Sequence, residues 1–124
     1  MRFVLIAVLM FAAISARAEW TMLGETDKAV YYLDPATIRG DGSLRRIWEL
    51  QELKARGMDG ELSRRVLYEY DCERERERGL SASSHSGPLT TGELLASISE
   101  TGKWNHVAVG TIGDILLRRV CARQ

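Results

Sequence analysis

Cys72 and Cys121 are the two cysteines of this 124-residue chain, and what they require of the fold depends on where the chain resides. In an oxidising compartment thiols pair, and two cysteines allow only one intramolecular pairing. In an exported protein we therefore expect a disulfide between Cys72 and Cys121. Closing a loop of about 50 residues stabilises a fold by roughly 4 kcal/mol on the chain-entropy model. The alternative is a redox or nucleophilic thiol, but the chain has no C-x-x-C spacing and no histidine near either cysteine.

The amino-terminal segment predicts export. Arg2 precedes an uncharged, mostly apolar stretch from Phe3 to Ala16 that is too short to span a bilayer comfortably. Small residues then stand three and one positions before the expected cleavage point, in Ala16-Arg17-Ala18. We expect a signal peptide over residues 1–18 and a mature domain over residues 19–124; an uncleaved anchor is the alternative. Since no cysteine at the cleavage point can accept a lipid, we expect a soluble periplasmic or released protein.

Composition narrows the function classes. Cleavage removes Arg2 and Arg17, which leaves 15 basic and 17 acidic residues and a net charge of −2. This balance gives no electrostatic case for a nucleic-acid partner. Two histidines and two distant cysteines do not form a recognisable zinc cluster, so we expect no metal and no cofactor. No long apolar run follows the signal peptide, so the mature chain is expected to lack a transmembrane segment and to form one domain.

Short runs of aromatic and β-branched residues, separated by turn residues, predict a sheet. Trp20–Leu23 and Val30–Leu33 are expected to form a hairpin, and Asp34-Pro35 ends its second strand because proline cannot donate to a ladder. We expect a loop over Ser83–Pro88. Further strands are expected over Leu44–Leu53, Leu62–Cys72 and Glu93–Ser99.

The last segment predicts a helix that the disulfide would hold on the sheet. Thr111 can cap a helix that begins at Ile112, with Asp114 near the amino end of its dipole. At helical spacing one half of this segment carries the apolar side chains and Cys121, with Asp114 opposite. Period-2 alternation places Val66, Tyr68, Tyr70 and Cys72 on one face of the fourth strand.

A stretch of alternating charge, Glu73 to Arg78, follows Cys72 directly. The poor helix formers after it favour a strand, in which Arg74, Arg76 and Arg78 would share one face. Such a row is a candidate surface for an anion or an acidic protein partner. The structural alternative is an exposed strand whose charges pair across the sheet and discourage edge aggregation. Both interpretations stay open at this point.

Two histidines give no catalytic constellation. His85 lies in a serine-rich segment and His106 lies near Trp104, and neither belongs to a G-x-S-x-G or H-E-x-x-H motif. We therefore expect no catalytic residues and no enzyme activity. A hydrolase site built from His85 and its neighbouring serines is the alternative, although its orienting acid and oxyanion hole are not visible in sequence.

The tryptophans are expected in the core. Trp20, Trp48 and Trp104 could instead anchor a partner, since tryptophan is common at interface hot spots. The mature chain has no phenylalanine, however, so the tryptophans and tyrosines are expected to fill much of the interior.

A set of landmarks is spread over nearly all of the mature chain. These landmarks are Trp20, Tyr32-Leu33-Asp34-Pro35, Ile38, Trp48, Ser63, Glu69-Tyr70-Asp71-Cys72, Arg78, Leu80-Ser81, Gly92, Trp104, Gly110-Thr111 and Val120-Cys121. Their order and spacing resemble the bacterial surface-adhesin protein E-like domain family. This resemblance implies an α+β fold: an antiparallel sheet of about six strands with one C-terminal helix held on its concave face by the Cys72–Cys121 disulfide.

The resemblance also implies an activity. The best-understood activity of that family is the binding of host extracellular-matrix and serum proteins at the bacterial surface, without catalysis. The resemblance therefore implies an exported protein that binds a protein partner, and it adds association with the outer-membrane surface to the periplasmic or secreted location expected above. The alternative is a periplasmic structural or inhibitor-like module. An adhesin would be reachable by antibody on intact cells, whereas a periplasmic module would require permeabilisation. The oligomeric state does not follow from the sequence.

Overall fold

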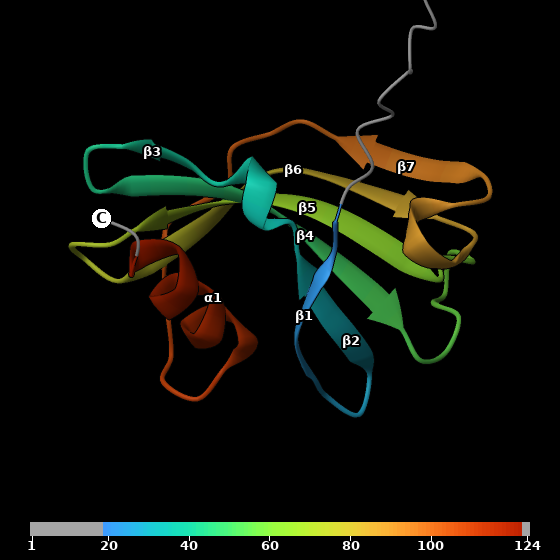
Figure 1. The fold of residues 1–124 in the computed structure, drawn as a ribbon. Coiled ribbons are helices and arrows are strands. Elements are labelled where there is room, and N and C mark those ends of the chain that lie inside the picture. The colour runs from blue at the N-terminus through green and yellow to red at the C-terminus, as the bar shows by residue number, and fades with distance from the viewer. Residues whose placement is uncertain (1–18, 123–124) are drawn as a thin grey trace, which may run out of the picture.

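A computed structural model describes residues 19–122, so the predicted signal peptide lies outside the described residues. The described chain forms a β-sheet and one α-helix, with two short 3₁₀ turns (Figure 1). In chain order the elements are β1 (Thr21–Glu25), β2 (Ala29–Leu33), η1 (Pro35–Thr37), β3 (Arg39–Asp41), β4 (Leu44–Leu53), β5 (Ser63–Asp71), β6 (Arg76–His85), η2 (Pro88–Thr90), β7 (Leu94–Ile98), β8 (Asn105–His106) and α1 (Ile112–Cys121).

The sheet is antiparallel at every pairing, in the order β1-β2-β4-β5-β6-β7. Two short strands extend it: β3 pairs with β4 beyond the end of β2, and β8 pairs with the start of β6. The predicted α+β fold with about six strands is confirmed, and β3 and β8 are additions that the sequence did not predict. The prediction for β4 matches the observed bounds, Leu44–Leu53.

The C-terminal helix α1 lies against one face of the sheet (Figure 1). Thr111 caps it as predicted, since its hydroxyl accepts the backbone N–H of Asp114 at 3.2 Å. The apolar side of α1 packs on the sheet through a buried cluster that spans β2, β4, β5 and the helix. This core consists of Leu33, Ile47, Tyr70, Val107, Leu116, Leu117 and Val120, with Tyr68 and Cys121 packed against it.

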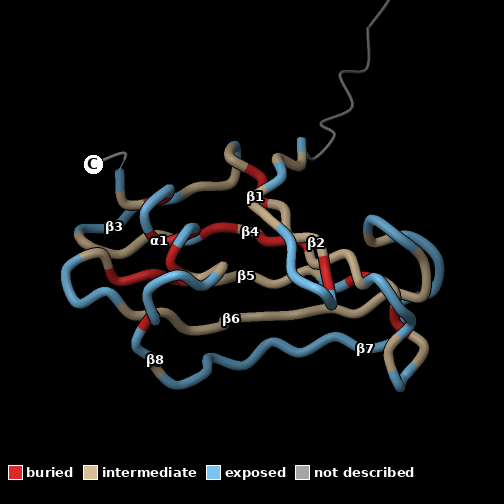
Figure 2. Tube along the Cα trace, turned by 90° about the horizontal axis from the view of Figure 1, so that it is seen from below, coloured by how far each residue is buried: buried red, intermediate tan, exposed pale blue. Residues whose placement is uncertain are grey.

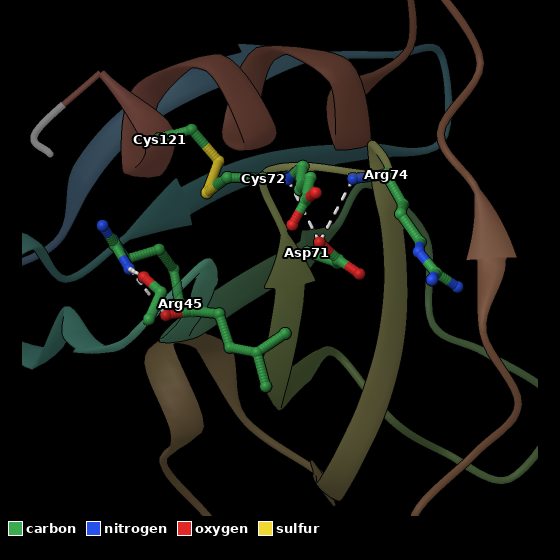
Figure 3. Close-up of a disulfide and its surroundings, with 8 residues drawn as sticks. Arg45, Asp71, Cys72, Arg74 and Cys121 are labelled. Atoms are coloured by element: carbon green, nitrogen blue, oxygen red, sulfur yellow. Dashed lines mark hydrogen bonds between the residues drawn. A yellow bond between two sulfur atoms is a disulfide. The ribbon is translucent and has the colours of Figure 1, made fainter.

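A disulfide ties the helix to the sheet. Cys72, just after β5, is bonded to Cys121 at the end of α1, with the two Cα atoms 5.6 Å apart (Figure 3). The predicted pairing and the predicted docking of the helix on the Tyr68–Tyr70 face are therefore confirmed.

The helix differs from its prediction at Asp114, which is buried and was expected on the solvent side. Its carboxylate accepts the Gly110 N–H at 3.0 Å and pairs with Arg118 Nε at 3.1 Å. These contacts supply hydrogen-bond donors and an opposite charge for the buried Asp114 carboxylate.

The predicted strand over Glu73–Arg78 is wrong in its first half, because the chain turns there to form the β5–β6 hairpin. Asp71 accepts the backbone N–H groups of Glu73 at 3.1 Å and Arg74 at 3.2 Å, an arrangement typical of Asx turns. Glu75 completes the reversal in the left-handed region, with φ of 49°. The three arginines therefore do not share one strand: Arg74 lies in the turn, and only Arg76 and Arg78 lie on β6.

Two further expectations are corrected. The segment expected to be a loop from Ser83 begins as strand, because β6 pairs with both β5 and β7 up to His85. The tryptophans are half-buried and do not belong to the core cluster, which aliphatic side chains and Tyr70 fill. Burial is greatest along the middle strands, whereas β7 is exposed over its whole length (Figure 2).

Candidate functional site

The face of the sheet opposite α1 carries a set of arginines arranged around buried acids. Side chains alternate along a strand, so Tyr70 of β5 points to the helix while Glu69 points to the opposite face. The register places Arg46 of β4 on one side of Glu69 and Arg78 of β6 on the other. Arg46 Nε donates to Glu69 Oε2 at 2.8 Å, and Arg78 Nε and Nη2 donate to Oε1 at 2.9 and 2.6 Å. Three charged side chains therefore form one linked group.

The electrostatics of Glu69 follow from these contacts. Burial by itself raises the pKa of this carboxyl, but the hydrogen bonds and charges of Arg46 and Arg78 outweigh it and hold the pKa below the ordinary value of 4.5. Glu69 is 2% exposed, and two guanidinium groups share its single negative charge. The group therefore carries an excess positive charge, and 57% of the Arg46 side chain is exposed to solvent.

A second ion pair lies one step along the hairpin. Arg76 Nε donates to Asp71 Oδ2 at 3.0 Å. Burial raises the pKa of Asp71, but the N–H groups of Arg74 and Glu73 and the side chain of Arg76 outweigh it, so the pKa stays below 3.8. The same carboxylate therefore closes the hairpin turn and positions an arginine on β6.

Trp104 lies over both of these arginines. The guanidinium carbons of Arg76 and Arg78 are 4.4 and 4.2 Å from the centre of its ring, within the range of cation–π contacts. The ring therefore orders two arginines that are each already fixed by a carboxylate. We name Arg46, Arg76, Arg78 and Trp104 the arginine–tryptophan surface.

A shallow pocket adjoins this surface at the β3–β4 end. Its volume is about 330 Å³, and Arg39 and Asp41 of β3 line it together with Arg46, Glu69 and Arg78. Arg39 is exposed, and no ion pair to a carboxylate forms at it in the part of the chain that the structure describes. Its Nη1 instead donates to the backbone carbonyls of Ala36 and Ile38, at 2.9 and 3.0 Å. The pocket is thus lined by an exposed cation that no carboxylate of the described residues neutralises.

The fold separates one of the three predicted partner-binding residues, Arg74, from the other two, Arg76 and Arg78. Arg76 and Arg78 lie together under Trp104, whereas the Arg74 side chain extends away from the disulfide at the hairpin turn (Figure 3). Sequence reasoning missed Arg39 and Arg46, which lie on the earlier strands β3 and β4. Pairing the predicted strands Leu44–Leu53 and Leu62–Cys72 as a hairpin could have suggested Arg46. The residue of the first strand that lies opposite Glu69, however, depends on the length and shape of the connecting loop, which the sequence does not determine.

The serine and histidine considered for a hydrolase lie close together. Ser83 Oγ and His85 Nε2 are 2.9 Å apart on one face of β6. Among the hydrogen bonds of residues 19–122, none joins this imidazole to a carboxylate, so the orienting acid of a triad is not in place there. Within residues 19–122, no three His, Cys, Asp or Glu side chains gather in a group that could hold a metal ion. The helix in these residues falls short of the length and apolar character that a membrane span requires.

Solved structures share this fold. Crystal form II of Haemophilus influenzae protein E aligns with a TM-score of 0.68 at 13% identity, over 86% of this chain and 89% of that one. The selenomethionine form aligns with a TM-score of 0.68 at 14% identity, over 86% and 88% of the two chains. Protein E from non-typeable H. influenzae gives a TM-score of 0.64 at 13% identity, over 88% and 79%. No curated protein matches the chain.

Structural likeness at these low identities shows the fold alone, whereas a comparison with family models shows the family. The model of the family described as surface-adhesin protein E matches residues 20–122, which includes every strand, the helix and both cysteines. The chain belongs to the surface-adhesin protein E family.

Proposed function

We infer that this chain is an exported, non-catalytic binding protein that takes an acidic segment of a host matrix or serum protein on its arginine–tryptophan surface. Family membership supports an adhesin-like surface protein. The observation that carries the choice of surface is the sharing of one buried carboxylate, Glu69, by Arg46 and Arg78. That arrangement leaves positive charge at a surface whose arginines are already ordered.

Pre-ordering favours binding because an arginine that is already fixed loses less side-chain entropy when a partner arrives. Arg78 is held by Glu69 and by Trp104, and Arg76 is held by Asp71 and by the same ring. Arginine and tryptophan are enriched at interface hot spots, and guanidinium groups bind carboxylates in a planar, bidentate geometry. The exposed Arg46 and Arg39 supply the donors that a partner carboxylate would meet.

Binding to immobilised fibronectin, laminin and collagen, and to whole serum, tests the proposal. Arg39→Gln combined with Arg46→Gln removes the two exposed cations and leaves Arg78 paired with Glu69. We expect at least a ~10-fold loss of affinity, typical of losing charge-assisted contacts at an interface, and a marked weakening with added salt. Arg118→Gln, on the exposed side of α1, is the matched control because its side chain is 65% exposed and lies on the helix. Equal binding by the double variant and the control would overturn the choice of surface.

Antibody labelling of intact cells tests the proposed location. A surface adhesin is labelled without permeabilisation, whereas labelling only after the outer membrane is opened would favour a periplasmic module. Intact mass measurement of the exported protein tests the proposed signal peptide, since cleavage after Ala18 gives a chain that begins at Glu19.

A further inference from the structure

A polar recess lies between the sheet and the first turn of α1, on the face opposite the arginine–tryptophan surface. Its volume is about 190 Å³. It adjoins a larger groove of about 690 Å³ that runs from the β1–β2 turn to the start of the helix, and the two share four lining residues. Side chains of β2, β4, β5 and β6 and the first two residues of α1 line it.

Glu49 is the feature of this recess that packing does not explain. It is 3% exposed, yet no arginine or lysine pairs with it within residues 19–122. Burial above all raises its pKa to about 7, the nearby Glu77 carboxylate adds to the rise, and the Gln51 side chain opposes it. A buried acid that faces a cavity without a cation is an unusual and costly arrangement.

The other buried acids of the described chain show what Glu49 lacks. Each of them accepts a hydrogen bond from a backbone N–H or an arginine, either at a turn, at the helix start or across the sheet. These acids are Asp34, Glu61, Glu69, Asp71 and Asp114. Glu49 has only the neighbouring amide of Gln51. An unused carboxylate therefore points into the recess.

Glu77 supplies a second carboxylate at the same place. It lies against the start of α1, where a Cβ on Gly113 would stand 3.0 Å from Glu77 Oε2. The positive end of the helix dipole interacts favourably with a negative charge at this position. Gly113 thus provides the space that the carboxylate occupies.

Three tyrosines complete the lining. The rings of Tyr68 and Tyr70 are 6.0 Å apart, and Tyr31 belongs to both the recess and the groove. Burial raises the pKa of Tyr68 and of Tyr70, so both hydroxyls stay protonated. The recess therefore combines two carboxylate acceptors with aromatic rings, the combination that recognises organic cations.

We propose that this recess binds a primary alkylammonium group, with Glu49 and Glu77 accepting its N–H donors and the tyrosine rings contacting its methylene groups. An ammonium has three donors and no acceptor, which suits a site with two carboxylates. The adjoining groove would hold the rest of the molecule. The same chemistry is offered by a lysine side chain of a protein and by a free aliphatic diamine. The site goes beyond the proposed adhesin function and does not depend on it.

Titration of the ¹⁵N-labelled protein with n-butylammonium, followed by NMR, tests the site, with n-butanol as the neutral compound of matched shape. We expect saturable shifts in residues of the recess with butylammonium and none with butanol. Glu49→Gln and Glu77→Gln should each weaken binding at least ~10-fold, because each removes a charged acceptor from the recess. Glu100→Gln, an exposed change on the loop after β7, should leave binding unchanged. Tyr68→Phe keeps the ring and should cost less than either glutamine variant.

Three results would overturn the proposal: no saturable shifts with butylammonium, equal shifts with butanol, or the same loss in Glu100→Gln as in Glu49→Gln. The ¹⁵N spectrum of each variant reports directly whether it is folded. Putrescine and N-acetyl-lysine amide then separate the two sources, and saturable binding of either supports the ammonium site. Binding to matrix proteins by Glu49→Gln is a separate readout, so loss of this site and loss of the arginine–tryptophan surface can be told apart.

Discussion

Arg78 on β6 and Glu69 on β5 face each other across the sheet, and both Nε and Nη2 of the arginine reach the same carboxylate oxygen, at 2.9 and 2.6 Å. The other oxygen is occupied by Arg46 Nε at 2.8 Å. Glu69 therefore joins β4, β5 and β6 on the face that α1 does not cover. This carboxylate is a structural centre for the arginine–tryptophan surface.

Replacing Glu69 should weaken the fold and disorder that surface. Glu69→Ala leaves Arg78 without a carboxylate at a site where its side chain is only 26% exposed. We expect a loss of about 2–3 kcal/mol in the free energy of unfolding, in the range for hydrogen bonds to charged groups. Urea denaturation measures it. Glu100→Ala, at an exposed position, should change the unfolding midpoint little, and equal midpoints for the two variants would contradict the structural role.

Stability should depend on pH through Glu49. Its pKa is about 7 in the folded protein against an ordinary 4.5, so the folded state binds this proton more tightly than the unfolded state. The resulting stabilisation is complete below about pH 4.5 and is lost as the pH rises through about 7. At about 1.4 kcal/mol per pKa unit the total is of the order of 3 kcal/mol.

Glu49→Gln isolates this contribution because the amide resembles the neutral acid and does not ionise. Relative to the parent protein, the variant should become more stable from pH 5 to pH 8. Urea midpoints at half-unit intervals provide the comparison. Since every other group is common to both proteins, parallel curves would show that the titration of Glu49 does not affect folding.

Breaking the Cys72–Cys121 bridge should be the most destabilising single change on the helix side. The bridge joins residues 49 positions apart, which corresponds to a stabilisation of roughly 4 kcal/mol on the chain-entropy model. Thermal melting of Cys72→Ser/Cys121→Ser should show a much lower midpoint than that of the parent protein. Thiol labelling of the parent under non-reducing denaturation should find no free thiol, and two labels would contradict the bridge.

The helix cap gives a smaller and more local effect. Thr111→Ala removes the acceptor of the Asp114 N–H and the hydroxyl that donates to the Ala108 carbonyl at 2.7 Å. We expect a loss of about 1 kcal/mol, and Thr111→Ser should restore most of it. Amide hydrogen exchange should show faster opening in the first turn of α1 than in β4, and uniform acceleration would argue against a local role.

Sequence patterns predicted those features that short stretches of chain determine. The run Leu44–Leu53 and the start of α1 at Ile112 agree with the structure, because apolar periodicity and a capping threonine act locally. The hairpin after β5 was missed because it contains neither glycine nor proline. Its one signal is Asp71, whose carboxylate accepts two backbone N–H groups of the turn.

The candidate site was predicted only in part for a different reason. Which arginine faces Glu69 depends on the register of three strands, and Trp104 approaches Arg76 and Arg78 from a segment that follows β7. A shortage of phenylalanine suggested tryptophans in the core, but Trp48 and Trp104 contact arginine side chains instead. Composition shows how many aromatic rings are available and leaves their neighbours undetermined.

The disulfide also determines how this domain responds to tension. A pull on the two ends of the described chain passes through the sulfur atoms, so the 49-position segment from Cys72 to Cys121 cannot lengthen. At about 3.3 Å per extended residue, this segment would otherwise add roughly 160 Å to the length of the stretched chain. Only the part before Cys72 can be drawn out, which spares β6, Trp104 and α1 from forced extension. A binding protein under flow would therefore keep three of the four residues of its arginine–tryptophan surface, Arg76, Arg78 and Trp104, on the segment that cannot stretch.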